Sequence, residues 1–346
     1  MMKTRKIKFL SVLAAVAVAV AGGACSEQAQ QSTPQTEAAK GPTIRIGYSA
    51  WPGWFPWRLA EKRELFRKHG VNVELRWFDN YLDSLKALSA GQLDGNCQTL
   101  NDTISSVAGG SDQVIVLVND NSVGNDKVIV SKEIRTIADL KGKRVAAEEG
   151  AVDHFLLLLG LREAGLDASS IDFQPLETGA AAAAFVAGKL DAVAVFAPFT
   201  TQALKREGSH ELFSSKDYPG AIPDHLVVTR KLMDERPEAV QALVDTWFET
   251  RKVMSAEPDA TLTLLAQRAG VSEEEYDEYG KGTRLFDISD NLHAYTPSND
   301  MTSLHFAADR IGQFLKENNF IKDIPDAKKF LDDRFVKDYS SRTNGR

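Results

Sequence analysis

The alternation of strand-like and helix-like segments after residue 43 is the feature that most limits what this chain can fold into. Short apolar or alternating runs predict strands at residues 43–48, 71–78, 93–98, 114–118, 127–130, 143–147, 171–176, 190–196 and 226–229. Helical patterns separate most of them, at 56–69, 81–90, 101–108, 136–140, 154–164, 180–187 and 199–207. This order favours mostly parallel sheets covered by helices, so we predict an α/β fold.

Beyond residue 229 the pattern is mainly helical, with helices predicted at 238–256, 259–269, 273–279 and 301–318. Within the alternating part, AGQLDGNCQ at 90–98 is similar to AGKLDAVAV at 187–195. Each stretch ends a helix on Ala-Gly, continues with Leu-Asp, and enters a strand of small residues. This weak repeat predicts two similar lobes, in which Asp94 and Asp191 have the same structural role at a strand start.

Residues 1–24 predict a segment that is removed rather than folded. Four basic residues between positions 3 and 8 precede a short apolar run at 9–21, which is too short to span a bilayer comfortably. Small residues lead directly to Cys25, so the segment resembles a bacterial lipoprotein signal peptide, cut before a cysteine that then carries lipid. An ordinary secretory signal followed by a chance cysteine is the alternative.

Residues 25–42 are polar and lack apolar periodicity, which predicts a flexible tether between the lipid anchor and the folded body. The only other cysteine is Cys97, so no disulfide is expected if Cys25 carries lipid. A net charge of −7, with no basic stripe outside the N-terminus, argues against nucleic-acid binding. The length of 346 residues and 43% hydrophobic composition allow a large core and about two domains.

Several phrases carry a family resemblance along nearly the whole mature chain. They are GYSAWPGWFPWRLAEKRELFRKHGVNVEL, LKALSAGQLDG, LKGKRVAAEEGAVDHFLLLLGLREAGL, FVAGKLDAVAVFAPF and HLVVTRKLMDERPEAVQALVDTW. In this order and spacing they resemble the periplasmic substrate-binding proteins of the nitrate, sulfonate and taurine (NMT1/THI5-like) class of ABC importers. Such proteins capture a small solute between two lobes and deliver it to a membrane permease and its ATPase.

The resemblance implies a two-lobed periplasmic-binding-protein fold, type II-like, with two mostly parallel sheets and a two-strand hinge. It implies lobe one at residues 43–128 and 229–340, lobe two at 129–228, and crossing strands near Val128 and Val227. It also implies a monomer without a cofactor, located in the periplasm and, given Cys25, anchored to a bacterial membrane by lipid.

Ligands of such α/β proteins lie at the carboxyl ends of strands, which selects a few turns. The turn SAWPGWFPW at 49–57 holds three tryptophans and a phenylalanine. We expect Trp51 and Trp54 to form an aromatic wall that holds a flat or cationic group, and Trp57 to lie in the core. Core packing of the whole turn is the alternative.

Residues 148–153 read EEGAVD and place Glu148, Glu149 and Asp153 at one strand-to-helix turn. One acid at a helix start is explained by the helix dipole, at about 0.3–1 kcal/mol, but three exceed that need. In this family, members that take oxyanions tend to have Gly with Ser or Thr in this turn. We therefore predict that Glu148 and Asp153 attract a cation.

Other strand ends add Asp79, Asp102, Glu177 and Phe196 as candidate ligand-binding residues. Together with the tryptophans they favour a small cationic or NH-rich nitrogen compound, guanidinium- or amidine-like, bound by forked carboxylate hydrogen bonds. Urea or another neutral amide is the alternative, as are nitrate, a sulfonate or taurine.

A pyrimidine-synthase-like enzyme and a tethered sensor are the alternatives from other classes. The signal-like N-terminus and the lack of a catalytic motif oppose the enzyme. The six histidines are scattered, without metal-ligand spacing, so no metal is expected. His154 beside Asp153 could suggest acid–base work, but we favour a packing role for it.

Overall fold

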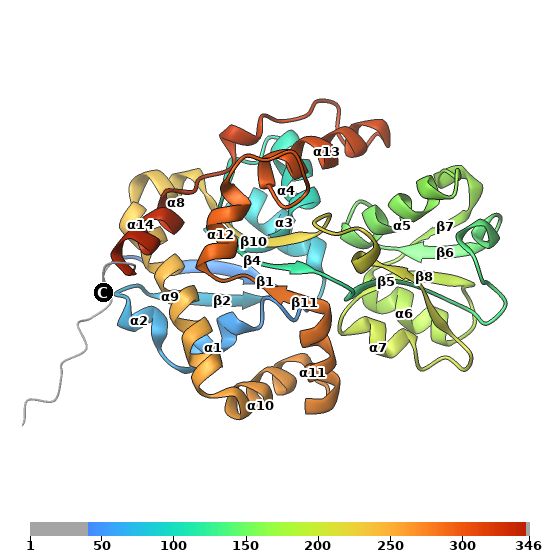
Figure 1. Ribbon diagram of the computed structural model, residues 1–346, viewed down its shortest axis with the longest axis horizontal. Helices are drawn as coiled ribbons and strands as arrows, with labels where there is room; N and C mark the ends of the chain where they lie inside the picture. The colour runs from blue at the N-terminus through green and yellow to red at the C-terminus, as the bar shows by residue number, and fades with distance from the viewer. Residues whose placement is uncertain (1–40, 344–346) are drawn as a thin grey trace, which may run out of the picture. The chain divides into compact units, whose positions relative to one another are not determined.

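The computed structural model describes residues 41–343, which form two β-sheets with helices around them (Figure 1). The first sheet has the strand order β11-β4-β10-β3-β1-β2. Its strands are Ile44–Tyr48 (β1), Val73–Trp77 (β2), Gly95–Thr99 (β3), Gln113–Ser122 (β4), Pro223–Thr229 (β10) and Thr283–Leu285 (β11). The second sheet, of order β7-β6-β8-β5-β9, contains Asp126–Val130 (β5), Arg144–Ala147 (β6), Asp172–Pro175 (β7), Ala192–Phe196 (β8) and His210–Ser214 (β9). The predicted α/β class is confirmed.

Both sheets are mixed rather than mostly parallel. β1 runs parallel to β2 and β3, but β10 runs antiparallel to β3 and β4, and β5 runs antiparallel to β8 and β9. β5 and β10 are the strands that receive the chain from the other sheet. Each of these two strands begins beside the carboxyl ends of its neighbours, so it must run antiparallel to them.

The chain crosses between the sheets at residues 123–125 and 215–222. Val128 and Val227, near which crossing strands were predicted, lie in β5 and β10, the strands that follow the two crossings. We propose that each sheet is the core of one lobe, and we call these lobe one (first sheet) and lobe two (second sheet).

The helices α1 to α7 follow the predicted pattern, and they are Pro56–Lys62, Leu65–Lys68, Tyr81–Ser89, Leu100–Ala108, Val152–Glu163, Thr178–Val186 and Phe199–Ala203. The C-terminal part adds α8 to α14, at Arg230–Glu235, Pro237–Ala256, Pro258–Ala269, Glu273–Gly282, Ile288–Tyr295, Leu304–Glu317 and Arg334–Thr343. Short 3₁₀ turns lie at Ile137–Leu140, Ala168–Ser170, Ser215–Asp217 and Ala327–Lys329. The single helix predicted at 56–69 is two helices, because Glu64 adopts a left-handed conformation with φ 53°.

The two lobes share the same aspartate–arginine interaction at the start of a strand, as the sequence repeat predicts. In lobe one, Asp94 accepts hydrogen bonds from the backbone and the guanidinium of Arg45, at 2.8 Å each. In lobe two, Asp191 accepts from the backbone and guanidinium of Arg144, at 3.0 and 2.9 Å. Each aspartate therefore ties the loop after a helix to the neighbouring strand.

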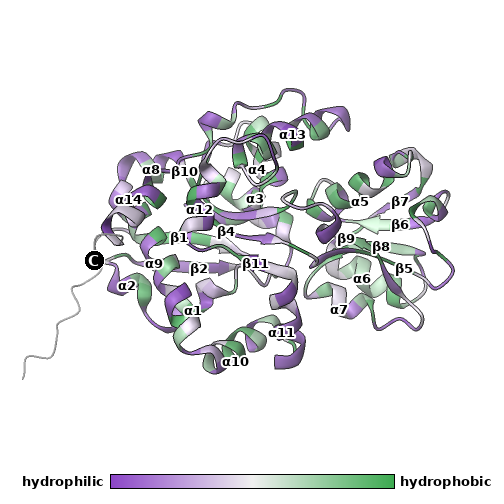
Figure 2. Cartoon of the chain, in the orientation of Figure 1, coloured by the Kyte–Doolittle hydropathy of each residue, from purple (hydrophilic) through white to green (hydrophobic). Residues whose placement is uncertain are grey.

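The interior of both lobes is apolar, and Figure 2 shows β6 and β8 in the green of hydrophobic residues. Trp57 is buried against Trp247 of α9, with ring centroids 4.8 Å apart, so its predicted core position is confirmed. Cys97 is buried in β3 with a free thiol. Within residues 41–343, no helix has the length and apolar character needed to cross a bilayer.

Candidate ligand-binding site

Strand ends from both sheets converge on a small cavity between the lobes, with about 230 Å³ of empty space that is partly open to solvent; we call it the aromatic cavity. It is lined by Trp51, Trp54, Tyr81, Thr99, Asp126, Val152, Phe196, Ile222 and Asp224. Strand pairing explains the convergence of such distant residues. Asp224 of β10 lies opposite Thr99 of β3 on one side and Asp120 of β4 on the other, while Asp126 lies opposite Phe196 in the second sheet.

Four buried aromatic side chains form the walls of this cavity. Trp51 lies 6.5 Å from Phe196, Trp54 lies 5.5 Å from Tyr81, and Tyr81 lies 6.3 Å from Phe196, measured between ring centroids. Aromatic faces carry a negative quadrupole, so such a cage attracts cations. Trp51, Trp54 and Phe196 were predicted here from the sequence. Tyr81 was missed, although its position directly after a strand-end turn, at the start of α3, was a usable signal.

Two carboxylates face the same cavity without a protein partner for all their oxygens. Asp126 and Asp224 are each 1% exposed, and within the described part of the chain the Oδ2 atom of each has no hydrogen-bond donor. Burial raises the pKa of Asp126 to about 7 and raises that of Asp224 well above its usual range. Unpartnered buried carboxylates are costly, so this site favours a proton or a positively charged ligand.

Asp120 lies beside them, behind the indole of Trp51. Its Oδ1 accepts a hydrogen bond from Trp51 Nε1 at 3.0 Å, and its Oδ2 has no donor among the described residues. The turn at residues 49–57 can approach Asp120 this closely only because residue 53 is glycine. A Cβ at this position would lie 1.9 Å from Asp120 Oδ2. Neither Asp120 nor Asp126 was predicted from the sequence as a site residue, and no local pattern marks Asp224, which lies at the start of an ordinary strand.

A second cavity of about 200 Å³ adjoins the first and shares Tyr81 and Phe196 with it. We call it the acidic cavity; it is lined by Ser49, Ala50, Asp79, Tyr81, Glu148, Glu177, Thr178, Phe196 and Phe199. The structure thus brings together the predicted residues Asp79, Glu148 and Glu177. Glu148 is buried and accepts a hydrogen bond from Thr178 Oγ1 at 3.2 Å, and burial raises its pKa to about 7. Asp79 and Glu177 are exposed.

Two predicted ligand residues, Asp102 and Asp153, line neither cavity. The Oδ2 of Asp102 accepts hydrogen bonds from Tyr81 OH at 2.8 Å and Thr99 Oγ1 at 2.7 Å, so it orients two residues of the aromatic cavity. Burial raises the pKa of Asp102 to about 7.

Asp153 accepts hydrogen bonds from the backbone N–H groups of Glu148 at 3.1 Å and His154 at 3.0 Å. Its carboxylate therefore stabilises the turn at residues 148–153 and is not directed into either cavity. His154 stacks on Phe173 with ring centroids 4.3 Å apart, and burial lowers its pKa to about 4. This is the packing role that we favoured.

The protein does not neutralise these acids with its own cations. In residues 41–343, neither cavity has a lysine or arginine in its lining. Lys127 attracts Asp126 but is paired with Glu211, and the cation that acts on Asp120 is Arg251 of α9. No group of histidine, cysteine and acidic residues in the described chain is arranged to hold a metal ion.

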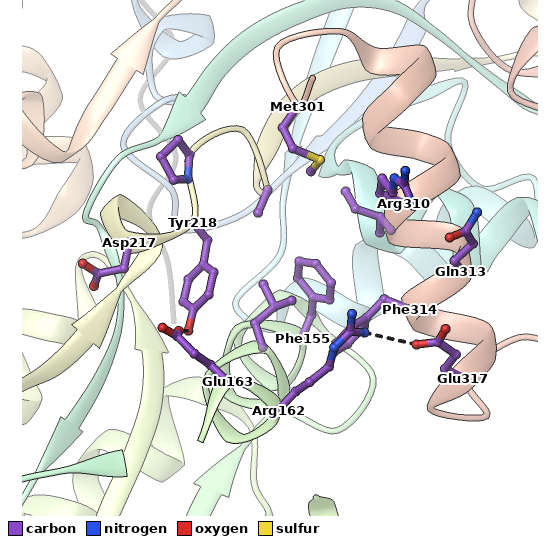
Figure 3. Close-up of a pocket in the computed structure, with 14 residues that line it drawn as sticks. Phe155, Arg162, Glu163, Asp217, Tyr218, Met301, Arg310, Gln313, Phe314 and Glu317 are labelled. Carbon is purple, nitrogen blue, oxygen red and sulfur yellow. Dashed lines mark hydrogen bonds and ion pairs between the residues drawn. The ribbon is translucent and has the colours of Figure 1, made fainter. Parts of the chain in front are cut away.

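A larger hollow, with about 1,250 Å³ of empty space that is partly open to solvent, lies between α5, α13 and the crossing segment at residues 217–221 (Figure 3). Here Arg162 of lobe two pairs with Glu317 of lobe one at 3.1 Å, and Tyr218 donates a hydrogen bond to Glu163 at 2.7 Å. Phe155 meets Phe314 edge-on at 5.3 Å. Strand ends do not converge on this hollow, so we treat it as a contact between the lobes rather than the ligand site.

Two sheets joined by crossing segments, with a small cavity at their strand ends, are typical of the solute-binding proteins that serve ABC importers. This class binds its solute and does no chemistry on it. The chain belongs to the NMT1-like family, whose model matches residues 37–270.

The relatives are binding proteins as well. The chain is 29% identical over 232 residues to a putative aliphatic sulfonates-binding protein of Escherichia coli (strain K12), covering 66% of this chain and 72% of the relative. It is 26% identical over 295 residues to the taurine-binding periplasmic protein of the same organism, covering 82% and 89%. The crystal structure of the periplasmic aliphatic sulphonate binding protein SsuA from Escherichia coli shares the fold, with a TM-score of 0.69, 24% identity, and coverage of 84% and 97%.

Proposed function

We propose that this protein captures a small planar cation of the guanidinium or amidine type in the periplasm and delivers it to an ABC permease and its ATPase. The observation that carries the proposal is the pair of buried carboxylates, Asp126 and Asp224, each with an unpartnered oxygen in the lining of an aromatic cavity. A planar cation with several N–H donors supplies both the charge and the forked hydrogen bonds that these oxygens need.

Size and energy support the same class of ligand. The aromatic cavity is small: only about 10 Å³ of it is open to the centre of a water molecule, far below the roughly 300–1,000 Å³ of drug-sized sites, so it excludes large solutes. Two charge-assisted hydrogen bonds contribute about 1.5–3 kcal/mol each. A desolvated cation–π contact adds about 2 kcal/mol. The total approaches the roughly 8 kcal/mol of a micromolar complex.

The proposed ligand differs in charge from the sulfonates and taurine named for the relatives. A sulfonate in the aromatic cavity would face Asp126 and Asp224 without any lysine or arginine from the lining. In a buried site of low dielectric, like charges repel strongly. We therefore propose that this branch of the family keeps the fold and the transport role but exchanges an anion site for a cation site.

Isothermal titration calorimetry at pH 8 and low salt tests the proposal with guanidinium chloride, acetamidinium, urea, taurine and nitrate. We expect micromolar binding of guanidinium or acetamidinium, and a loss of 100-fold or more in Asp126→Asn and Asp224→Asn. Asp172→Asn is the matched control, since Asp172 is an exposed acid of β7 outside both cavities. Micromolar binding of taurine or nitrate, with no heat from either cation, would overturn the proposal.

We also propose that lipid on Cys25 anchors the mature protein, with residues 25–42 as its tether; residues 25–40 lie outside the described part of the chain. The signal-like segment before Cys25 supports this proposal. Labelled palmitate should appear in the wild-type protein and be absent from Cys25→Ala. Equal labelling of both proteins would contradict it.

A further inference from the structure

We infer that Asp120 and Asp224 share a proton in the empty protein and release it to solvent when a cation enters the aromatic cavity. Binding is then an exchange of one proton for one cation. The inference rests on the proposed function, because it requires a positively charged solute. It goes further by naming the residue pair that makes the site prefer a cation over a neutral molecule of the same shape.

The strand register places the two carboxyl groups side by side. Asp224 of β10 lies directly opposite Asp120 of β4, and side chains at such antiparallel positions lie on the same face of a sheet about 5 Å apart. Both residues are buried, and with both ionised their Oδ2 atoms have no donor in the described chain. Ionised carboxylates only accept hydrogen bonds, so a proton between the two is the one donor that the pair can supply for itself.

The groups around the pair leave it short of positive charge. Those that act on it from neighbouring elements are Trp51, Cys97, Asp102, Asp126, Arg251 and Tyr276. Trp51 donates one hydrogen bond and two of the others are acids. The single cation among them, Arg251, also faces Asp287 and Asp290, so its charge is shared.

Burial is the main cause that raises the pKa of both Asp120 and Asp224, and the nearby acids raise it further. Two carboxyl groups held this close cannot both ionise easily, and they titrate as a pair.

A bound cation removes the need for that proton. No bond of the ligand is made or broken: the proton passes from the pair to bulk water, and the ligand's charge takes its place beside Asp224. Urea has a similar shape and similar N–H groups but no charge, so it leaves the proton where it is. Below the apparent pKa of the pair, cation affinity should therefore rise about tenfold per pH unit, while urea affinity stays flat.

Calorimetry in buffers of different ionisation enthalpy measures the released proton directly. We expect guanidinium binding at pH 8, where Asp126 with its pKa of about 7 is mainly ionised, to release about one proton per cation in phosphate, HEPES and Tris. The Kd should fall about tenfold per pH unit near pH 8, and more steeply below pH 7, where Asp126 also gives up a proton. Asp120 lines neither cavity, so Asp120→Asn should still bind guanidinium at pH 8, but with little proton release and a flatter pH profile.

A second variant covers the case in which Asp120→Asn does not fold. Trp51→Phe keeps an aromatic wall but removes the N–H that donates to Asp120, which should strengthen the pair's hold on its proton and move the pH midpoint of binding upward. Guanidinium binding with buffer-independent heat would overturn the inference and leave the proposed function standing. Unchanged proton release in Asp120→Asn would overturn the assignment to this pair. No guanidinium binding at any pH would overturn the proposed function, and the inference with it.

Discussion

Replacing Asp126 by asparagine should stabilise the empty protein at high pH, although the residue is part of the proposed ligand site. In the native protein, burial raises the pKa of Asp126 to about 7 from its usual value of 3.8. The unfolded chain therefore loses this proton near pH 4, whereas the native protein keeps it until about pH 7. Between these values the native state binds more protons, so stability falls as the pH rises.

The size of the effect follows from the shift. One pKa unit corresponds to about 1.4 kcal/mol, so the charge on Asp126 costs about 3 kcal/mol more at pH 8 than at pH 5. Asparagine is similar in shape and does not titrate. The variant should thus be about as stable as the wild type at pH 5 and more stable by about 3 kcal/mol at pH 8. At about 2 °C per kcal/mol, this is a relative gain of roughly 6 °C in Tm.

Thermal unfolding at pH 5, 6, 7 and 8 without ligand is the appropriate assay, because guanidinium chloride as a denaturant would also occupy the site. The buried histidines His154 and His225, whose pKa values burial lowers to about 4 and 3, also change stability with pH, but they are present in both proteins and cancel in the difference. Asp172→Asn is again the control and should differ from the wild type by a constant amount. A Tm difference for Asp126→Asn that does not change with pH would refute the reasoning.

Three further substitutions test the parts around the cavity. Tyr81→Phe removes the hydroxyl that donates to Asp102 at 2.8 Å and should cost about 1–3 kcal/mol in thermal unfolding, more at pH 8 than at pH 5, because it is the ionised carboxylate that needs the donor. Gly53→Ala would place a Cβ 1.9 Å from Asp120 Oδ2, so it should lower Tm and weaken guanidinium binding at least tenfold in calorimetry. Phe314→Ala removes the ring contact between α13 and α5 shown in Figure 3, and should weaken binding about threefold to tenfold, without touching either cavity. Unchanged affinity in Phe314→Ala would mean that this contact does not help to hold the lobes together.

The sequence predicted the strands of the two sheets because apolar periodicity is a local signal, and the strand-end turns followed from it. It missed β9 and β11, which are short edge strands, and it also missed α8, α12 and α14. α14 buries Phe335, Val336 and Tyr339 on one face, so its helical periodicity was a usable signal that was not recognised. The aromatic half of the site was predictable, since indoles at a strand end are costly to expose.

The acidic half was predicted only in part, and the reason is pairing between distant strands. Glu148 could be named because three acids are close together in the sequence. Asp120 and Asp224, however, meet only because β4 and β10 are neighbours in one register, and a shift of one residue would turn either side chain to the other face. No local pattern contains that information. Asp102 and Asp153 were predicted as ligand residues because they are acidic. Their carboxylates instead accept hydrogen bonds from nearby protein donors, hydroxyl groups at Asp102 and backbone N–H groups at Asp153.

The position of Asp153 bears on the charge of the ligand that we propose. The start of a helix presents free N–H groups and is a general site for anions. At the start of α5, the carboxylate of Asp153 itself accepts from the N–H groups of Glu148 and His154, while the N–H of Gly150 donates to His154 Nδ1 at 3.2 Å. The chain thus fills its own anion site with a covalently attached acid. With those donors used, the charged groups of residues 41–343 that line the two cavities are all carboxylates, which supports the cation that we propose as ligand.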